Sequence, residues 1–153
     1  METERMREPD STPLCPSVPP EWEGSFAFGV VGGTVPNPRL RYLDEPLPVT
    51  EELLARTQPV RPTEVLRFAA PCAGGSCSHF VGNRCSLVDR VVQILPAVTE
   101  TLPPCILRPA CRWWQQDGKS ACQRCPQIVT DNIFAPEAIV RVTSPPRRES
   151  AGP

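Results

Sequence analysis

The sequence predicts a small α+β or irregular domain organised by metal, in which a short β-rich N-terminal segment precedes a helical, cysteine-rich module. Its 153 residues include 21 prolines and only nine aromatic residues, which leaves little material for a large hydrophobic core. Seven of the eight cysteines and the single histidine lie between residues 72 and 125. Both ends are polar and proline-rich, which predicts disordered termini because such segments bury too little apolar area to offset their ordering entropy.

These shifts in composition divide the chain into five parts. They are a disordered tail over residues 1–24, a small β-rich segment over 25–71, a cysteine-rich metal-binding module over 72–130, a short packed segment over 131–142 and a second disordered tail over 143–153. Cys15 falls in the first tail with no other metal-ligating residue near it in the sequence. We therefore expect Cys15 to take no part in metal binding.

The β-rich segment contains three signals of regular structure. FAFGVVGGTV at residues 26–35 is apolar and β-branched around a pair of glycines, and predicts two short strands joined by a tight turn. The glycine spacing matches no phosphate-binding loop. The alternating RLRYL at residues 39–43 predicts an edge strand, and Thr50, followed by two glutamates, predicts the N-cap of a short helix. EVLRFAA at residues 64–70 is an apolar run that leads to the first clustered cysteine.

One amphipathic helix is predicted inside the cysteine-rich module. SLVDRVVQIL at residues 86–95 has apolar residues at helical spacing and opens with Ser86-x-x-Asp89, a pattern close to a capping box. Pro96 should end this helix. The helix therefore separates two groups of cysteines.

The first cysteine set has the pattern C-x4-C-x-H-x5-C, with glycines between the cysteines that allow the backbone to turn tightly. Its candidate metal ligands are Cys72, Cys77, His79 and Cys85. A histidine can instead be an ordinary hydrogen-bonded side chain, but this one is two residues from a cysteine, which favours ligation. Cysteine and histidine together also suit a nucleophile and its base, yet no second histidine and no evident oxyanion site accompany them.

The second cysteine set has the pattern C-x5-C-x10-C-x2-C. Its candidate ligands are Cys105, Cys111, Cys122 and Cys125, and a C-x2-C pair is a common way to place two thiolates on one metal centre. Residues 112–117 predict a helix that Gly118 ends, which would return the C-x2-C pair toward the cysteine that precedes the helix. Buried cysteines of an ordinary core have no reason to cluster in this way.

The ligand count and the ligand spacing favour different metals. Eight ligands divide into one three-cysteine, one-histidine shell and one four-cysteine shell, as structural zinc prefers. The uneven spacing of the second set and the proline at 126 favour iron–sulfur ligation, so we expect a [4Fe–4S] cluster there, with zinc as the alternative. The pattern resembles that of small iron–sulfur regulators, whose cluster is held by four cysteines. Their spacings differ from these, so the resemblance assigns no individual residue.

The cysteine-rich stretch carries a formal excess of three positive charges between residues 72 and 125. Arginines such as Arg112 and Arg124 can compensate thiolate charge and tune a cluster, or contact nucleic acid beside Trp113 and Trp114. The excess is small, which favours compensation, and the tryptophans are expected to lie in the core or over the metal. A protein partner is then expected, and no small-molecule substrate is evident.

The compartment and the reaction class follow from what the sequence lacks. METERMREPD is charged throughout, unlike a secretory signal, and no apolar run reaches the length of a membrane span. We therefore expect a cytoplasmic protein without membrane contact, in which disulfides are disfavoured. Apart from the cysteine–histidine pair, nothing resembles a catalytic constellation, and the C-x2-C pair lacks the βαβ setting of a dithiol enzyme. The expected role is electron transfer or redox sensing, or a zinc scaffold for protein or nucleic-acid binding.

Overall fold

The computed structural model describes residues 12–34, 37–82, 84–130 and 137–143, and has a mixed α+β architecture. The main sheet is antiparallel with the strand order β1-β4-β2-β3. Its strands are β1 (Leu14–Val18), β2 (Phe26–Gly33), β3 (Pro38–Pro48) and β4 (Leu66–Pro71). A second, two-stranded sheet pairs β5 (Phe80–Val81) with β6 (Arg84–Cys85).

Strands β2 and β3 form a hairpin whose turn lies later than the sequence predicts. The expected turn at the glycine pair is wrong, because β2 continues through Gly33 and the chain reverses between Thr34 and Asn37. Gly33 adopts a φ of +79° directly before this reversal, and a Cβ atom on Gly29, earlier in β2, would lie 2.7 Å from Leu40 Cδ1 of β3. The predicted edge strand at 39–43 is confirmed as part of β3.

Strand β1 corrects the assignment of residues 1–24 to a tail. Leu14, Pro16 and Val18 are buried, and β1 pairs with β4 at the edge of the sheet. Proline is tolerated there because an edge strand leaves some backbone N–H groups without a ladder partner. Residues 1–11 and 144–153 of the two predicted tails lie outside the described residues.

Six α-helices fall within the described ranges. They are α2 (Glu51–Ala55), α3 (Pro62–Val65), α4 (Ser86–Ile94), α5 (Arg112–Asp117), α6 (Lys119–Cys122) and α7 (Glu137–Thr143). The Thr50 hydroxyl accepts a hydrogen bond from Leu53 N at 3.0 Å, which confirms the predicted N-cap of α2. None of the described helices is long and apolar enough to cross a lipid bilayer.

Helices α4 and α5 form where the sequence predicts them. Helix α4 buries an apolar stripe that includes Leu87 and Val91, and Gly118 ends α5 with a φ of +62°. The predicted capping box is wrong, because Cys85 is the N-cap of α4 and the Ser86 hydroxyl donates to His79 O. The predicted packed segment at 131–142 is described only from residue 137, where α7 begins and packs against α4.

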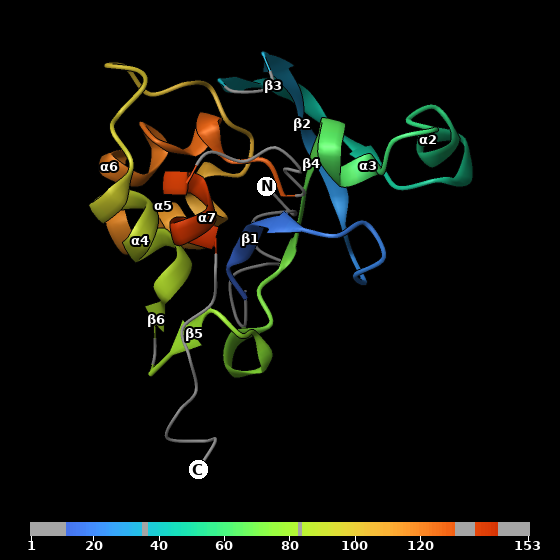
Figure 1. Ribbon diagram of the computed structural model, residues 1–153. Coiled ribbons are helices and arrows are strands. Elements are labelled where there is room, and N and C mark those ends of the chain that lie inside the picture. Colours follow the sequence, from blue (N-terminus) through green and yellow to red (C-terminus); the bar gives the residue numbers. More distant parts are fainter. Residues whose placement is uncertain (1–11, 35–36, 83, 131–136, 144–153) are drawn as a thin grey trace.

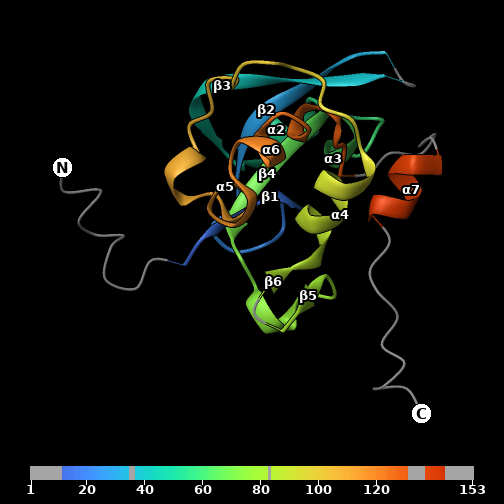
Figure 2. The ribbon, with the colours of Figure 1, turned by 90° about the vertical axis from the view of Figure 1, so that its left-hand side faces the viewer.

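The sheet and the cysteine-rich half share one hydrophobic core. Helices α4 to α7 lie on one side of the sheet and α2 and α3 lie on the other (Figures 1 and 2). The main core joins Phe28 and Leu40 of the sheet to Val88, Trp113 and Ile128 of the cysteine-rich half. The core therefore continues across the sequence boundary at residue 72.

Candidate functional site

The four cysteines of the second set line one cavity, which we call the second cavity. Cys105 lies in the loop before the 3-10 turn η2 (Arg108–Ala110), and Cys111 is the N-cap of α5. Cys122 ends α6, and Cys125 begins the 3-10 turn η3 (Cys125–Gln127). The free volume between them is about 20 Å³, and Pro16, Phe28 and Tyr42 of the main sheet complete the wall. The helical return predicted from Gly118 does bring these cysteines together.

Two cysteines of the second set, Cys111 and Cys125, are buried, and Cys105 and Cys122 are half-buried. Burial raises the pKa of Cys111 to about 12, and burial also raises the pKa values of Cys105 and Cys122. Such thiols are protonated at neutral pH and are poor nucleophiles, whereas a metal ion displaces the proton outright. As the side chains stand, no three His, Cys, Asp or Glu residues in the described ranges converge closely enough to hold a metal ion.

Arg67 is the functional candidate that the sequence analysis missed. It is 0% exposed, and it is the only charged side chain buried among the described residues. Its Nη2 lies 3.3 Å from Cys125 Sγ, and its guanidinium lies over the rings of Phe28 and Trp113 at 5.2 and 5.6 Å. An arginine in the middle of the apolar run EVLRFAA was the available sequence signal.

The remaining hydrogen bonds of Arg67 go to backbone carbonyls. Nε donates to Pro16 O at 3.0 Å, and Nη1 donates to Cys125 O and Ile128 O at 2.9 and 3.1 Å. Within the described part of the chain, none of its hydrogen bonds goes to a carboxylate. Arginine cannot lose its proton in a protein, so this buried cation has sulfur and dipoles as its neighbours.

The four residues of the first set line a second space of about 520 Å³, which we call the first cavity. Cys72 and Cys77 flank the 3-10 turn η1 (Gly74–Ser76), and Gly74 adopts a φ of +60°, as its predicted role in a tight turn requires. Gly74 N donates to Cys72 Sγ at 3.3 Å, and His79 N donates to Cys77 Sγ at 3.4 Å. Backbone N–H groups directed at sulfur are typical of thiolate ligands.

Two residues near the first cavity depart from their expected environments. The His79 side chain lies 2.8 Å from Arg90 Nη2 through its Nδ1 atom, so its nearest polar partner is a cation. Cys15, which the sequence analysis set apart from both ligand groups, lines this cavity together with Cys72, Cys77 and Cys85. The expectation that it has no neighbouring donor is wrong, because β1 carries it into the fold.

The tryptophans and arginines to which the sequence assigns a possible role lie in different environments. Trp113 is 2% exposed and lines both cavities, which confirms a core position. Trp114 lines the second cavity, and the guanidinium carbon of Arg108 lies 5.5 Å from the centre of its ring. Arg112 lines the first cavity. Arg124 lines neither cavity. Its side chain donates hydrogen bonds to the backbone carbonyls of Leu95 and Ser120, and these bonds hold it in place.

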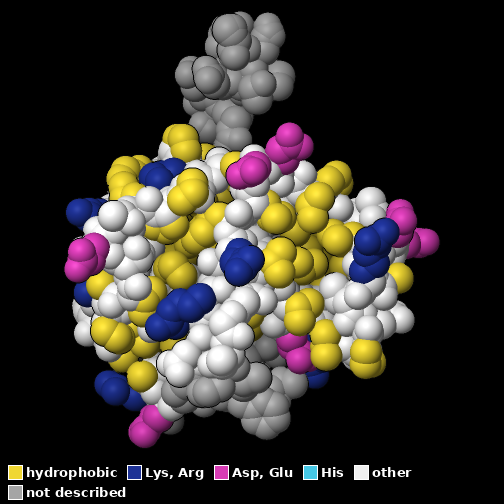
Figure 3. Space-filling model, turned by 90° about the horizontal axis from the view of Figure 1, so that it is seen from above, with side chains coloured by type: hydrophobic (Ala, Val, Ile, Leu, Met, Phe, Trp, Pro, Cys, Tyr) yellow, Lys and Arg dark blue, Asp and Glu magenta, His cyan; other side chains and the backbone are white. Residues whose placement is uncertain are grey.

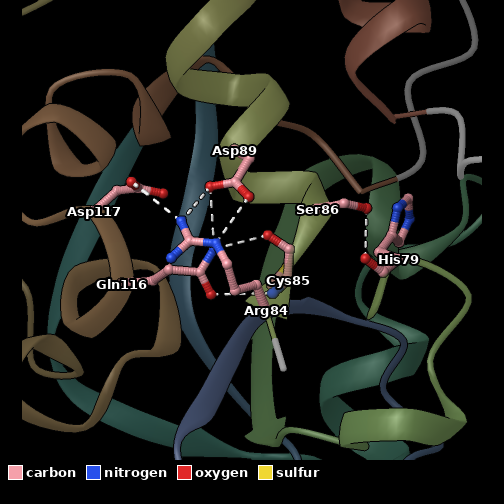
Figure 4. Close-up of polar contacts among 7 residues, drawn as sticks. All are labelled: His79, Arg84, Cys85, Ser86, Asp89, Gln116 and Asp117. Atoms are coloured by element: carbon pink, nitrogen blue, oxygen red, sulfur yellow. Dashed lines mark hydrogen bonds and ion pairs between the residues drawn. The ribbon is translucent and has the colours of Figure 1, made fainter. Parts of the chain in front are cut away.

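Gln116 of α5 fixes the backbone of Cys85 (Figure 4). Its Oε1 accepts from Cys85 N at 3.0 Å, and its Nε2 donates to Cys85 O at 2.8 Å and to Asp89 Oδ1 at 3.2 Å. Asp89 in turn forms an ion pair with Arg84 at 2.7 Å. Gln116 belongs to α5, whose N-cap is Cys111 of the second set, and it positions Cys85 of the first set.

Replacing Gln116 with leucine should lower the free energy of unfolding by about 1–3 kcal/mol, because two backbone groups at Cys85 lose their partners. Denaturant unfolding of the full chain measures this loss. The matched control is Gln115→Leu, since the exposed Gln115 side chain donates, among the described residues, to Pro109 O alone. Equal losses for the two variants would contradict the role given to Gln116.

The comparisons with known proteins complete the description of the site. No family model, no curated protein and no solved structure matches this chain.

Proposed function

We propose that the second cysteine set, Cys105, Cys111, Cys122 and Cys125, holds a [4Fe–4S] cluster, and that the protein passes single electrons to a protein partner or senses redox state in the cytoplasm. One observation carries this proposal: all four cysteines line a single cavity beside a buried arginine that contacts one of their sulfur atoms. The protein is not assigned an enzymatic activity.

The charge of Arg67 supports an anionic centre in the second cavity. Four thiolates around a core of charge 2+ leave a net charge of −2. Burying a cation without a compensating charge costs several kcal/mol, and neutral thiols supply no such charge. Arg67 and the nearby Arg108 side chain therefore fit a centre whose thiolates are deprotonated.

Unpartnered hydrogen-bond donors on the wall of the second cavity also support it. Among the described residues, Arg108 Nε and Trp113 Nε1 are buried without a hydrogen-bond partner, and both residues line the cavity. Buried donors are rarely left unpaired in folded proteins. The sulfur atoms of a cluster and of its ligands accept such hydrogen bonds, which stabilise the cluster and tune its potential.

A structural zinc ion at the second set is the second candidate, and the size of the cavity favours it. A free volume of about 20 Å³ holds about one water-sized body. In that case the metal would only support a surface that binds protein or nucleic acid. Trp113 is buried, so it offers no stacking surface to a base, and basic and acidic side chains are scattered among hydrophobic ones in Figure 3. These features favour a protein partner over nucleic acid.

Anaerobic reconstitution of the full chain with ferrous iron and sulfide tests the cluster. Cys111→Ser should remove the iron held by the second set, about four atoms per chain, with its share of the broad visible absorption. The control Ser120→Ala, on helix α6 beside Cys122, should leave the iron content and the visible absorption unchanged. If Cys111→Ser leaves iron and absorption unchanged and instead loses zinc, the cluster proposal is wrong and the zinc scaffold is supported.

A further inference from the structure

Strand β1 places its side chains alternately in the two cavities. Cys15 and Ser17 line the first cavity, whereas Pro16 lines the second, as the two-residue period of a strand requires. The register of β1 is fixed by pairing of Cys15 with Ala70 and by the hydrogen bond from Cys72 N to Pro13 O at 2.8 Å. The same pairing brings Cys15 beside the loop that carries Cys72.

Four thiols therefore line the first cavity. Burial, together with the nearby Cys85, Cys72 and Cys77, raises the pKa of Cys15 to about 12. Burial likewise raises the pKa of Cys85, with contributions from Cys77 and Cys72. Every cysteine of the chain now belongs to one of two groups of four.

The hydrogen bond of His79 argues against its role as a ligand. A guanidinium can only donate, so Nδ1 accepts from Arg90, and the proton of the neutral ring lies on Nε2. Binding of a metal at Nε2 would move the ring proton to Nδ1, where it would face the Arg90 guanidinium and break this hydrogen bond. Arg90 is itself held by Val142 O at 2.7 Å and Ser86 Oγ at 2.8 Å, so His79 joins a polar link between α4 and α7.

The wall of the first cavity carries donors suited to anionic sulfur. Arg112 lines it, and within the described residues its Nε is buried without a hydrogen-bond partner while its guanidinium lies 5.1 Å from the Phe80 ring centre. Cys85 is the N-cap of α4, where backbone N–H groups face the sulfur. Together with the N–H groups directed at Cys72 and Cys77, these donors would stabilise thiolates.

We propose that Cys15, Cys72, Cys77 and Cys85 form a second, all-thiolate metal centre, in which Cys15 takes the place expected for His79. The ligand is a thiophilic metal, either an iron–sulfur cluster or a zinc ion, because both bind four cysteines. The proposal does not depend on which metal the second set holds. Trp113 forms part of the wall of both cavities, so the two centres would share one tryptophan as a neighbour.

The test compares Cys15→Ser with His79→Ala in the full chain. Each variant is reconstituted anaerobically with ferrous iron and sulfide, and separately loaded with zinc, before iron and zinc per chain are measured. Cys15→Ser should lose the metal of one centre, about four irons or one zinc. His79→Ala and the control Ser120→Ala, at a residue that lines neither cavity, should keep it.

Two results would overturn the second centre. One is full metal content in Cys15→Ser, and the other is loss of the same metal in His79→Ala. X-ray absorption of the zinc-loaded natural chain gives an answer that needs no variant, since only sulfur should be bonded to zinc and imidazole nitrogen would contradict the proposal. The metal content of Cys111→Ser depends on the second set alone. The test therefore shows separately whether the proposed centre at the first cavity or the one at the second cavity is wrong.

Discussion

Arg67→Met should be the most damaging single substitution in the described part of the chain. It removes the buried cation beside Cys125 and leaves three carbonyl oxygens without their donor. Removing one partner of a buried charge interaction costs about 3–5 kcal/mol, a large share of the stability of a small domain. Denaturant unfolding of the metal-loaded protein measures the loss, and the amount of retained metal should fall with it.

Two matched variants show whether the charge or the shape of Arg67 matters. Arg67→Lys keeps the charge but cannot make the forked contacts, so its stability should lie between those of the natural protein and Arg67→Met. Arg41→Met, on the exposed face of β3, should change little. Where a cluster survives in Arg67→Met, its reduction potential should be lower, because a nearby positive charge stabilises the more negative reduced state. An Arg67→Met protein with natural stability and metal content would contradict an anionic centre.

Complete removal of metal should unfold the sheet together with the cysteine-rich half. Phe28 and Leu40 of the sheet lie in the same core as Trp113 and Ile128, and β1 lines both cavities. Structural zinc in small domains contributes about 10–16 kcal/mol of folding free energy, which matches or exceeds the whole stability of a typical domain. Neither half should therefore survive alone.

Amide hydrogen exchange before and after anaerobic chelation measures this coupling. Protection should disappear from β2 and β4 as well as from α4 and α5, and it should return when metal is restored. An apoprotein that keeps the exchange protection of β2 and β4 would show that the sheet folds without metal.

The elements that were predicted correctly are those with local signals. The apolar spacing of α4, the Thr50 N-cap and the Gly118 end of α5 depend on residues within one or two helical turns. The sequence analysis placed the turn after β2 too early, because a glycine pair indicates either a turn or the close approach of a neighbouring strand. A Cβ atom on Gly32 would lie 3.2 Å from Arg39 O of β3, and the reversal comes only after Gly33.

The missed residues depend on partners distant in sequence. Strand β1 pairs with residues fifty or more positions later, and its prolines resemble those of a disordered tail. For the same reason Cys15 could not be grouped with Cys72. The four cysteines of the second set lie within 21 residues and line one cavity, but Arg67 comes from the sheet and reaches that cavity only through the fold.

The way β1 and Trp113 enclose both cavities has a consequence for biosynthesis. Cys15 leaves the ribosome well before Trp113 and Ile128, which also line its cavity. The second cavity likewise joins Pro16 to Cys125. Until those later residues emerge, a nascent chain exposes its early thiols and cannot enclose either proposed centre. Metal insertion at the proposed centres would therefore come after synthesis of the whole cavity wall, and in the interval the thiols are open to oxidation.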